Sequence, residues 1–398
     1  MGVSTLPVFA TEAAAPATFP TSPQILFQEA AVAAMPPATS GPHAYWRAVL
    51  QHGSEGFAPN LRSQPGWISG PSGGWPLTVH DGACGNSFPA SLITQYVDYP
   101  RAELGLLGSP SRQLAARMGL MGLAALLRIA RADRVAQWNS WLLSTNLPPA
   151  GTVRATEAVT RELVRRFPDH AILLKNVDPS EDPDWPSTLS QAGYVLMTSR
   201  QVYHFDGRSG EFRSRSTVKR DLKEFARDTR YRWVGPTELS AADAPRITEL
   251  YQRLYLEKHS RLNTQYTESF VRRALREHWL EFHGIRRADG ALMGAFGFFT
   301  LGQTTSVPFI GYDTCLPQEE ALYRRLVSGM LQIIADREQH LNYSSGAGDF
   351  KLRRGAVPVI ESNAIYCAHL SRPQRSAFSL AARLLNQFVR PWMEQNPH

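Results

Sequence analysis

The side chains with the clearest catalytic potential lie in the last quarter of the sequence. Tyr312 and Asp313 close an apolar run at 304–312 that is expected to form a central strand. Functional groups of α/β proteins gather at the carboxyl ends of such strands. Asp313 would serve there as a general base, and Tyr312 would orient a bound donor. Asp349 is a second candidate base, with capping of a short helix as its alternative role.

Other reactive residue types are spaced in ways that argue against several kinds of site. Cys84, Cys315 and Cys367 are far apart and form no CxxC pair, so neither a zinc site nor a disulfide framework is indicated. A reducing cytoplasm fits this cysteine usage best. His278 and His283 have no ligand-like partners at helical spacing, and no metal is expected. No HExxH, P-loop or GxGxxG pattern occurs.

A basic segment lies near the middle of the chain. Between Arg208 and Arg232 there are nine Lys/Arg and four Asp/Glu, a local excess of +5 in a chain of net charge +7. Such a patch attracts RNA, a phosphorylated cofactor or an anionic membrane, unless it is only the solvated face of a helix. DNA is not an expected partner. The candidate polyanion contacts lie on or beside an expected helix at 216–228: Arg215, Lys219, Arg220 and Lys223.

The 398-residue chain is long for one domain, and its two halves share an order of elements. In both 134–205 and 304–369 we expect a strand, a proline-containing loop, a long helix, a short strand, a short helix and a final strand. This pattern predicts an α/β fold of two units in tandem, each a mixed central sheet flanked by helices. The expected segments are a disordered tail at 1–40, an N-terminal degenerate domain at 41–207 with an irregular lead-in at 41–75, a C-terminal domain at 208–370, and an amphipathic helix at 371–398.

The N-terminal tail is rich in Ala, Pro, Thr and Ser and lacks the pattern of a secretory signal. The most apolar run, at 118–127, is too short to span a bilayer. We therefore expect a cytoplasmic protein without a transmembrane segment.

The second half resembles the GNAT acyltransferase superfamily in its order of elements. After the basic helix the expected elements are a strand at 231–234, helices at about 241–258 and 267–279, strands at 281–287, 292–301 and 304–312, a helix at about 318–337, a strand at 340–343, a short helix around 350, and a strand at 357–369. The likeness covers about residues 75–370. It is greatest to families that duplicate the fold, namely the Fem-type peptidoglycan aminoacyltransferases and the acetyltransferase branch related to cellulose biosynthesis.

Two short motifs carry this resemblance. The run Gly-Asp-Phe-Lys-Leu-Arg-Arg-Gly at 348–355 is similar to a Phe-Lys-x-x-x-Gly signature near the end of Fem-type proteins. The basic helix beginning Val-Lys-Arg-Asp-Leu-Lys at 218–223 stands at the junction between the halves.

The resemblance implies a cleft where the fourth and fifth strands of the second unit separate. Donor amides would pair with the free edge of the fourth strand, where Gly311 would permit close approach. Lys351 would lie beside the reacting ester or thioester and stabilise the developing oxyanion. The implied donor-binding residues are Phe309, Ile310, Gly311 and Tyr323, and the implied acceptor-binding residues are Asn342, Ser344, Ser345 and Asp349.

One departure from the superfamily concerns the acyl donor. Most coenzyme A-dependent members hold the pyrophosphate in a glycine-containing turn at a helix N-terminus. The corresponding segment, 316–323, has no glycine and carries Glu319 and Glu320. Acids suit a helix N-terminus, yet they would repel a pyrophosphate.

The expected function is N-acyl transfer from a thioester donor, acyl-CoA or a carrier protein, to an amine of a small metabolite or amino-acid-like acceptor, with no permanently bound cofactor. One alternative is a Fem-type enzyme that uses aminoacyl-tRNA. The other is a non-catalytic RNA- or membrane-binding module on the same fold.

Overall fold

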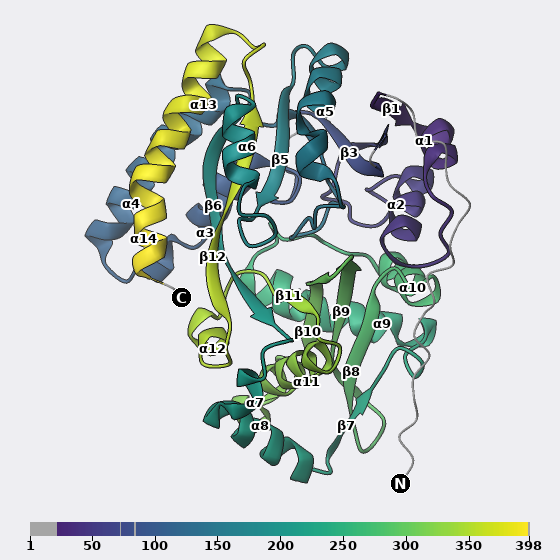
Figure 1. The fold of residues 1–398 in the computed structure, drawn as a ribbon. Helices are drawn as coiled ribbons and strands as arrows, with labels where there is room; N and C mark the ends of the chain where they lie inside the picture. The colour runs from purple at the N-terminus through teal and green to yellow at the C-terminus, as the bar shows by residue number, and fades with distance from the viewer. Residues whose placement is uncertain (1–21, 72, 83–84, 397–398) are drawn as a thin grey trace.

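A single sheet runs through both halves of the protein (Figure 1). The computed structural model describes residues 22–71, 73–82 and 85–396, so residues 1–21 of the tail predicted at 1–40, and also Cys84, lie outside the described residues. In the described part the sheet has 12 strands in the order β1-β2-β3-β4-β5-β12-β6-β11-β10-β9-β8-β7. The strands are β1 (Gln24–Phe27), β2 (Gln64–Gly70), β3 (Gly73–Asp81), β4 (Arg134–Trp138), β5 (Ala171–Val177), β6 (Val195–Asp206), β7 (Tyr231–Val234), β8 (Glu281–Arg287), β9 (Leu292–Leu301), β10 (Thr304–Tyr312), β11 (His340–Asn342) and β12 (Val357–Tyr366).

Helices cover both faces of this sheet. The α-helices are α1 (Gln28–Ala34), α2 (Gly41–His52), α3 (Tyr99–Ala102), α4 (Pro110–Ile129), α5 (Thr152–Arg166), α6 (Trp185–Gln191), α7 (Glu211–Ser214), α8 (Ser216–Arg227), α9 (Ala244–Tyr251), α10 (Glu268–Arg276), α11 (Leu322–Asp336), α12 (Gly348–Leu352), α13 (Arg372–Leu384) and α14 (Arg390–Gln395). Segments with π-helical bonding are η1 (Thr94–Asp98), η4 (Gln252–His259) and η6 (Leu385–Val389), and short 3₁₀ turns are η2 (Leu104–Leu107), η3 (Ala241–Asp243) and η5 (Gln318–Glu320).

The predicted tandem α/β architecture is confirmed by the order and pairing of these elements. The run β4-α5-β5-α6-β6 in the first half is matched by β10-α11-β11-α12-β12 in the second. In both runs the first two strands are parallel, β4 with β5 and β10 with β11. The second half also has the full order expected from the GNAT-like resemblance, with β7, two helices and the β8-β9-β10 meander before α11.

The two units exchange their last strands. Strand β6, which ends the first unit, lies between β11 and β12, and strand β12, which ends the second, lies between β5 and β6. The two exchanged strands pair antiparallel along most of their length, from Val357 opposite His204 to Ile365 opposite Val195. The predicted boundary at 207–208 therefore divides the sequence, but the sheet crosses it, because each unit is completed by a strand of the other.

The C-terminal helix packs on the first unit rather than the second. Helix α13 lies against α4 and β6. Its residues Phe378 and Ala381 join Leu123 and Leu127 of α4 in one buried cluster. The amphipathic helix expected at 371–398 is thus a structural part of the N-terminal half.

The N-terminal segment is more regular than its composition suggested. Residues expected to form a tail and an irregular lead-in contain β1, α1, α2 and β2. Strand β1 pairs antiparallel with β2, and Ala31 and Trp46 are fully buried. The Trp46 indole N–H donates to the Gly66 carbonyl at 2.9 Å. Sequences rich in small residues and proline have weak local preferences for helix or strand. Here contacts with other parts of the fold stabilise these elements.

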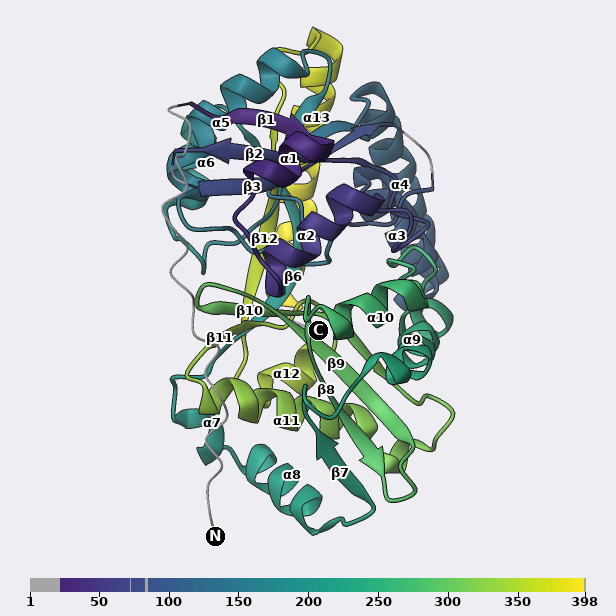
Figure 2. The ribbon, with the colours of Figure 1, turned by 90° about the vertical axis from the view of Figure 1, so that its right-hand side faces the viewer.

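Two cores sandwich the sheet of the second unit. Helices α9 and α10 pack on one face against Ala295 and Phe309, and α11 packs on the other against Phe296 and Ile310. Figure 2 shows these two layers on opposite sides of β8, β9 and β10. Within the described residues, no helix is both long and apolar enough to cross a bilayer.

Candidate functional site

Strands β10 and β11 pair over only three residues and then separate. Their parallel pairing joins Thr304–Ser306 to His340–Asn342. A register shift between Ser306 and Phe309 bends β10 at this point, where Pro308 also lacks a backbone N–H. Beyond Ser306, β10 pairs with β9 on one side, and within the described residues no strand pairs with its other edge. The expected free edge of the fourth strand is therefore present.

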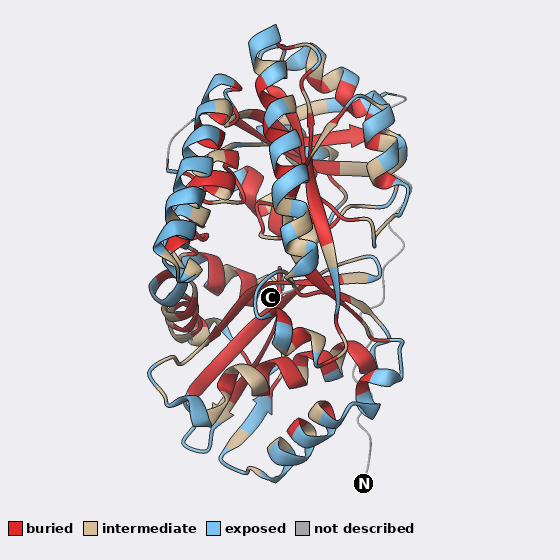
Figure 3. Cartoon of the chain, turned by 90° about the vertical axis from the view of Figure 1, so that its left-hand side faces the viewer, coloured by how far each residue is buried: buried red, intermediate tan, exposed pale blue. Residues whose placement is uncertain are grey.

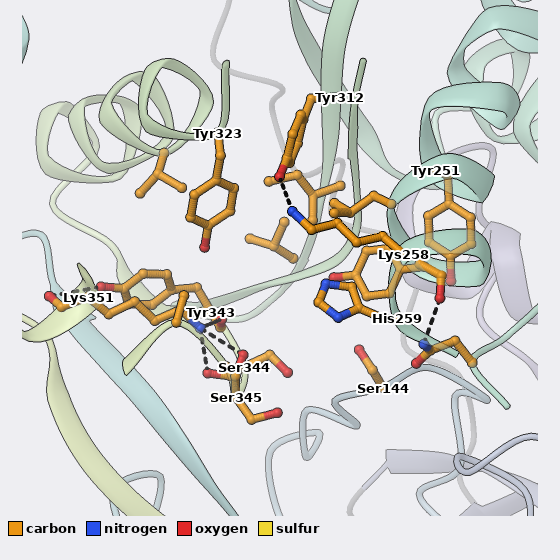
Figure 4. A pocket seen from close by; sticks show the side chains of 18 of the residues that line it. Ser144, Tyr251, Lys258, His259, Tyr312, Tyr323, Tyr343, Ser344, Ser345 and Lys351 are labelled. Atoms are coloured by element: carbon orange, nitrogen blue, oxygen red, sulfur yellow. Dashed lines mark hydrogen bonds between the residues drawn. The ribbon is translucent and has the colours of Figure 1, made fainter. Parts of the chain in front are cut away.

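A large cavity lies at this separation. Its volume is about 1490 Å³, beyond the 300–1,000 Å³ common for small-molecule sites, so it has room for two reactants together. The walls come from β10, the start of α11, the loop 343–347, segment η4, residues 199–201 of β6 and Trp392 of α14. Figure 4 shows side chains from several of these elements pointing into one space.

Lys351 lies in the wall of this cavity and holds the loop after β11. Its ammonium donates to the backbone oxygens of Tyr343 at 2.8 Å and of Ser344 and Ser345 at 3.0 Å each. The side chain is buried, and burial together with the nearby Arg200 charge lowers the pKa of Lys351 to about 7. All three N–H donors are used by the protein, so Lys351 fixes the shape of the loop. Its predicted oxyanion role would require one of these bonds to break.

Asp313 is tied to two arginines. Its carboxylate accepts from Arg246 at 2.7 Å and Arg253 at 2.6 Å, and also from the Cys315 amide at 3.0 Å. Burial favours the neutral acid, but the Arg246 hydrogen bond and the two positive charges outweigh it and lower the pKa of Asp313. A carboxylate paired with two arginines is a weak base. Through these arginines, Asp313 anchors α9 and η4 to the end of β10.

The predicted donor-binding residues on β10 point in different directions, because side chains alternate along a strand. Ile310 lines the cavity, whereas Phe309 is fully buried on the other face and stacks on Tyr251 at 4.6 Å between ring centroids. A Cβ on Gly311 would lie 2.5 Å from the backbone of Leu250. The close approach that Gly311 permits in the structure is therefore to the protein's own helix α9.

Two predicted tyrosines do meet in the cavity. The rings of Tyr312 and Tyr323 lie 6.0 Å apart, and Figure 4 shows the Tyr323 hydroxyl pointing into the open space. The Tyr312 hydroxyl accepts from Lys258 at 3.3 Å. Burial, with smaller contributions from neighbouring tyrosines, raises the pKa of Tyr323, so its phenol stays protonated and remains a hydrogen-bond donor.

The predicted acceptor-binding residues separate into two groups. Ser344 and Ser345 line the cavity. Asn342 is buried beneath them, where it accepts from the Ser344 amide at 3.0 Å and thereby shapes the loop. Asp349 is exposed in the first turn of α12 outside the cavity wall, and Ala347 occupies the cap position of that helix without a side-chain cap.

A buried ion pair from the exchanged strands supports the floor of the site. Arg200 of β6 donates to Glu361 of β12 at 2.8 Å and to the Ser344 hydroxyl at 3.1 Å. Glu361 is fully buried and also accepts from Asn176 at 2.8 Å. Removing one member of such a pair leaves an uncompensated buried charge. The loop of the second unit thus rests on groups whose register depends on the strand exchange.

Segment η4 contributes a titratable group that the sequence analysis missed. His259 ends this segment and lines the cavity beside Lys258. Burial, aided by the Lys258 charge, lowers the pKa of His259, so the imidazole is neutral at pH 7 and can accept a proton. π-Helical segments recur at functional sites. No local sequence pattern distinguishes this histidine, since only the fold brings η4 opposite β10.

The start of α11 presents one carboxylate to the cavity rather than two. Glu319 lines the cavity. Glu320 turns away, accepting from the Tyr231 hydroxyl at 2.8 Å and from Arg230 at 3.1 Å. Helix α11 begins after Ala321. This alanine adopts a positive φ of 53°, a conformation that glycine favours, so the turn forms without a glycine.

The basic helix α8 docks through its acids and exposes its cations. Asp221 is fully buried and pairs with Arg324 and Arg354. The four predicted polyanion contacts are all exposed: Arg215, Lys219, Arg220 and Lys223.

One group of side chains has the composition of a metal site. Ligand atoms of Glu181, His204 and His340 lie within 4.8 Å of one another. The two imidazoles hydrogen-bond at 2.7 Å, and His204 also binds Asp178 at 2.6 Å. Burial opposes a charge on His204, but the Asp178 hydrogen bond outweighs it and raises the pKa of His204, while burial lowers that of His340 to about 4. The two histidines and Asp178 are therefore hydrogen-bonded to one another, whereas Glu181 accepts from the Thr304 hydroxyl at 3.0 Å and its other oxygen has no partner among the described residues.

In the first unit, β4 and β5 correspond to β10 and β11. Residues 139–143, which follow β4, pack into the space between the units instead of lining an open cavity. The segment after β4 is buried from Asn139 to Leu143. Trp141 packs there against Trp46 and Phe299 at ring centroid distances of 6.2 and 5.4 Å. That the N-terminal unit is degenerate stays a prediction.

Several solved structures share features of this fold. A tandem GNAT protein from the clavulanic acid biosynthesis pathway is 14% identical, with a TM-score of 0.39 over 84% of this chain and 91% of that chain. The C-terminal domain of a putative lysylphosphatidylglycerol synthetase from Agrobacterium fabrum is 10% identical, with a TM-score of 0.44 over 66% and 92%. FemX is 7% identical, with a TM-score of 0.43 over 54% and 76%. No family model and no curated protein matches the sequence.

Proposed function

We propose that this protein is an N-acyltransferase that binds an acyl donor and an amine acceptor together in the cavity between β10 and β11. The observation that carries the proposal is the free edge of β10, which forms a wall of a cavity of about 1490 Å³. A free strand edge offers backbone N–H and C=O groups in a row, and these suit the amide groups of an extended donor. This is also the arrangement expected from the GNAT-like resemblance.

The proposed chemistry uses two groups that face each other across the cavity. His259 accepts the proton of the acceptor ammonium, which frees the amine to attack the donor carbonyl. Tyr323 donates a hydrogen bond to the oxyanion that forms, since its phenol remains protonated. As the tetrahedral intermediate collapses, the bond to the carrier sulfur breaks, and the extra proton on the attacking nitrogen passes to the departing thiolate, which leaves an amide and the free carrier thiol. The remaining rate advantage comes from holding both reactants side by side in one cavity.

Lys351 and Asp313 have positioning roles in this mechanism. Lys351 holds the 343–345 carbonyls, and Asp313 anchors Arg253 of η4, the segment that ends at His259. Both predicted catalytic groups thereby act on the geometry of the site instead of on the reacting atoms.

For the donor we propose a thioester, as acyl-CoA or on a carrier protein. The turn at Ala321 directs the start of α11 at the cavity, and helix N-termini attract phosphate groups. Only Glu319 opposes a phosphate there, because Glu320 is occupied by Tyr231 and Arg230.

Aminoacyl-tRNA is the second candidate donor. Lys219 and Lys223 are one helical turn apart on the exposed face of α8, and neither has an ion-pair partner among the described residues. A row of exposed cations of this kind suits an RNA backbone. A reaction sensitive to ribonuclease, and weakened by Lys219→Gln with Lys223→Gln, would identify this donor.

The direct test combines the purified chain with panels of acyl-CoA or aminoacyl-tRNA donors and amine acceptors, with mass spectrometry of the products and of any co-purified ligand. His259→Gln and Tyr323→Phe are each expected to lower kcat about 100-fold or more, the usual scale for a general base and for one oxyanion donor. His52→Gln is the matched control, because His52 is exposed on α2 outside the cavity wall.

Failure of this test has a definite meaning. If neither donor class is bound or consumed, acyl transfer is wrong. Salt-sensitive polyanion binding that survives His259→Gln, without any turnover, would instead identify the non-catalytic binding module.

A further inference from the structure

Helix α4 is apolar on two faces. Leu123, Ala124 and Leu127 are buried against the first unit. Leu114 and Met118 are 61% and 60% exposed. They belong to a second stripe at helical spacing, which runs along the outward side of the helix: Leu114, Met118, Met121 and Ile129. A helix that only covers a core needs one such stripe, so the outward stripe requires its own explanation.

The C-terminal helices repeat this arrangement. Ala377, Phe378 and Ala381 of α13 are buried. Phe388 and Trp392 are 63% and 56% exposed. They continue an outward stripe with a spacing of four residues that runs from α13 through η6 into α14: Leu380, Leu384, Phe388 and Trp392.

The two stripes form one surface. Helices α4 and α13 contact each other and lie side by side in Figure 1, and their outward faces are exposed in Figure 3. Of the 11 large hydrophobic side chains exposed in the described residues, only Trp233 and Val357 lie elsewhere, and the other nine are on these helices or at Leu106 just before α4. Concentrated exposed apolar surface of this kind marks a docking face.

The same surface is strongly basic. Helix α4 carries three arginines and no acid, and α13 to α14 carry four arginines and one glutamate, which gives +3 and +3, or +6 together. Three of these cations line a hollow of about 500 Å³ on α13 together with two serines and one leucine: Arg372, Arg375, Ser376, Ser379, Leu380 and Arg383. Arginine and serine side chains are the groups that bind phosphate oxygens.

We propose that α4 and α13–α14 form a docking face for an anionic lipid bilayer, with the apolar stripes at the acyl boundary and the arginines at the lipid phosphates. Aromatic and aliphatic side chains on one face, with arginines beside them, are the composition of helices that lie in a membrane interface. A charge of +6 suits anionic lipid. It opposes pairing with a second copy, because a two-fold dimer would bring two identical basic faces together.

The face adjoins the cavity. Trp392 belongs to the exposed stripe and also to the cavity wall, beside Met393. Docking therefore brings the cavity entrance close to the lipid headgroups. The membrane face does not depend on the proposed acyl transfer, since it rests on residues that take no part in that chemistry.

Vesicle flotation of the full chain tests the proposal. Vesicles of phosphatidylcholine with about one third phosphatidylglycerol are expected to carry the protein, vesicles of phosphatidylcholine alone to carry much less, and high salt to release it. Met118→Glu with Phe388→Glu is expected to reduce binding at least 10-fold. Arg375→Gln with Arg383→Gln is expected to reduce it about fivefold per arginine.

A matched control and a second measurement keep the test decisive. Val357→Glu changes another exposed apolar residue, on β12, and is expected to bind like the unmodified chain. Brominated lipid is expected to quench tryptophan fluorescence less in Trp392→Phe. The proposal is overturned if anionic vesicles at low salt do not carry the protein, or if Val357→Glu weakens binding as much as the stripe variants. It is equally overturned if Phe388→Glu abolishes a concentration-dependent dimer while vesicles bind neither form.

Discussion

Replacing Lys351 with methionine separates a positioning role from a catalytic one. Methionine keeps an unbranched apolar stem as far as Cε, lacks the terminal nitrogen, and so removes the three hydrogen bonds to the carbonyls of 343–345. Below pH 7, where the lysine is charged, the bond to the buried Tyr343 carbonyl is worth about 1.5–3 kcal/mol. The other two carbonyls are partly exposed, so water can replace about half of their contribution. After allowing for the charge that is no longer buried, we expect a loss of about 2–4 kcal/mol.

Thermal unfolding and amide hydrogen exchange measure this loss. For a chain of 398 residues that unfolds as one unit, the change corresponds to a melting temperature lowered by about 2–5 °C. Amides of 343–347 should also exchange faster, since the loop loses its anchor. Arg353→Met is the matched control, because Arg353 lies just after α12 with its side chain exposed and should change stability by less than about 0.5 kcal/mol.

One result would refute this reasoning. If Lys351→Met unfolds at the temperature of the unmodified protein and shows unchanged exchange at 343–347, while turnover is lost, the ammonium acts on the substrate. The oxyanion role implied by the family resemblance would then be right, and the positioning role wrong.

Three further predictions concern other parts of the site. Gly311→Ala should destabilise the protein by about 1–3 kcal/mol in urea unfolding, because its Cβ would meet the α9 backbone at 2.5 Å, whereas Gly210→Ala, with open space around it, should not. Glu361→Ala should cost about 3–5 kcal/mol by leaving a buried guanidinium unpaired, against less than about 0.5 kcal/mol for the exposed Glu394→Ala. Because the pKa of His259 lies below its usual 6.5 and the reaction needs the unprotonated ring, kcat/KM should rise as the pH passes through that lowered pKa and level off above it. His259→Gln should remove this acid limb, and an unchanged pH profile would contradict its role as the base.

Local patterns were sufficient to predict most elements of the second unit. The helix expected at 318–337 is α11 at Leu322–Asp336, and the strand expected at 357–369 is β12 at Val357–Tyr366. Such elements are encoded by hydrophobic periodicity and turn residues within a short window. The matching order of elements in the two halves predicted the tandem fold for the same reason.

The candidate site was only partly predictable. Tyr312 and Tyr323 share one cavity with Ser344, as the resemblance implied. His259 was not found, because its importance depends on η4 lying opposite β10. The partners of Asp313 were not found either, since Arg246 and Arg253 are 67 and 60 residues away in the sequence.

The sequence by itself determined most helices and strands of the second unit, and that two similar units follow one another. Only the tertiary structure decided that β6 and β12 exchange places, which sets Arg200 against Glu361 under the loop that lines the cavity. It also decided that α4 and α13 lie side by side, so that two separate apolar stripes become one surface. The physical reason is the range of the interactions: periodicity acts between near neighbours in the chain, whereas strand order, burial and charge pairing depend on residues that only folding brings together.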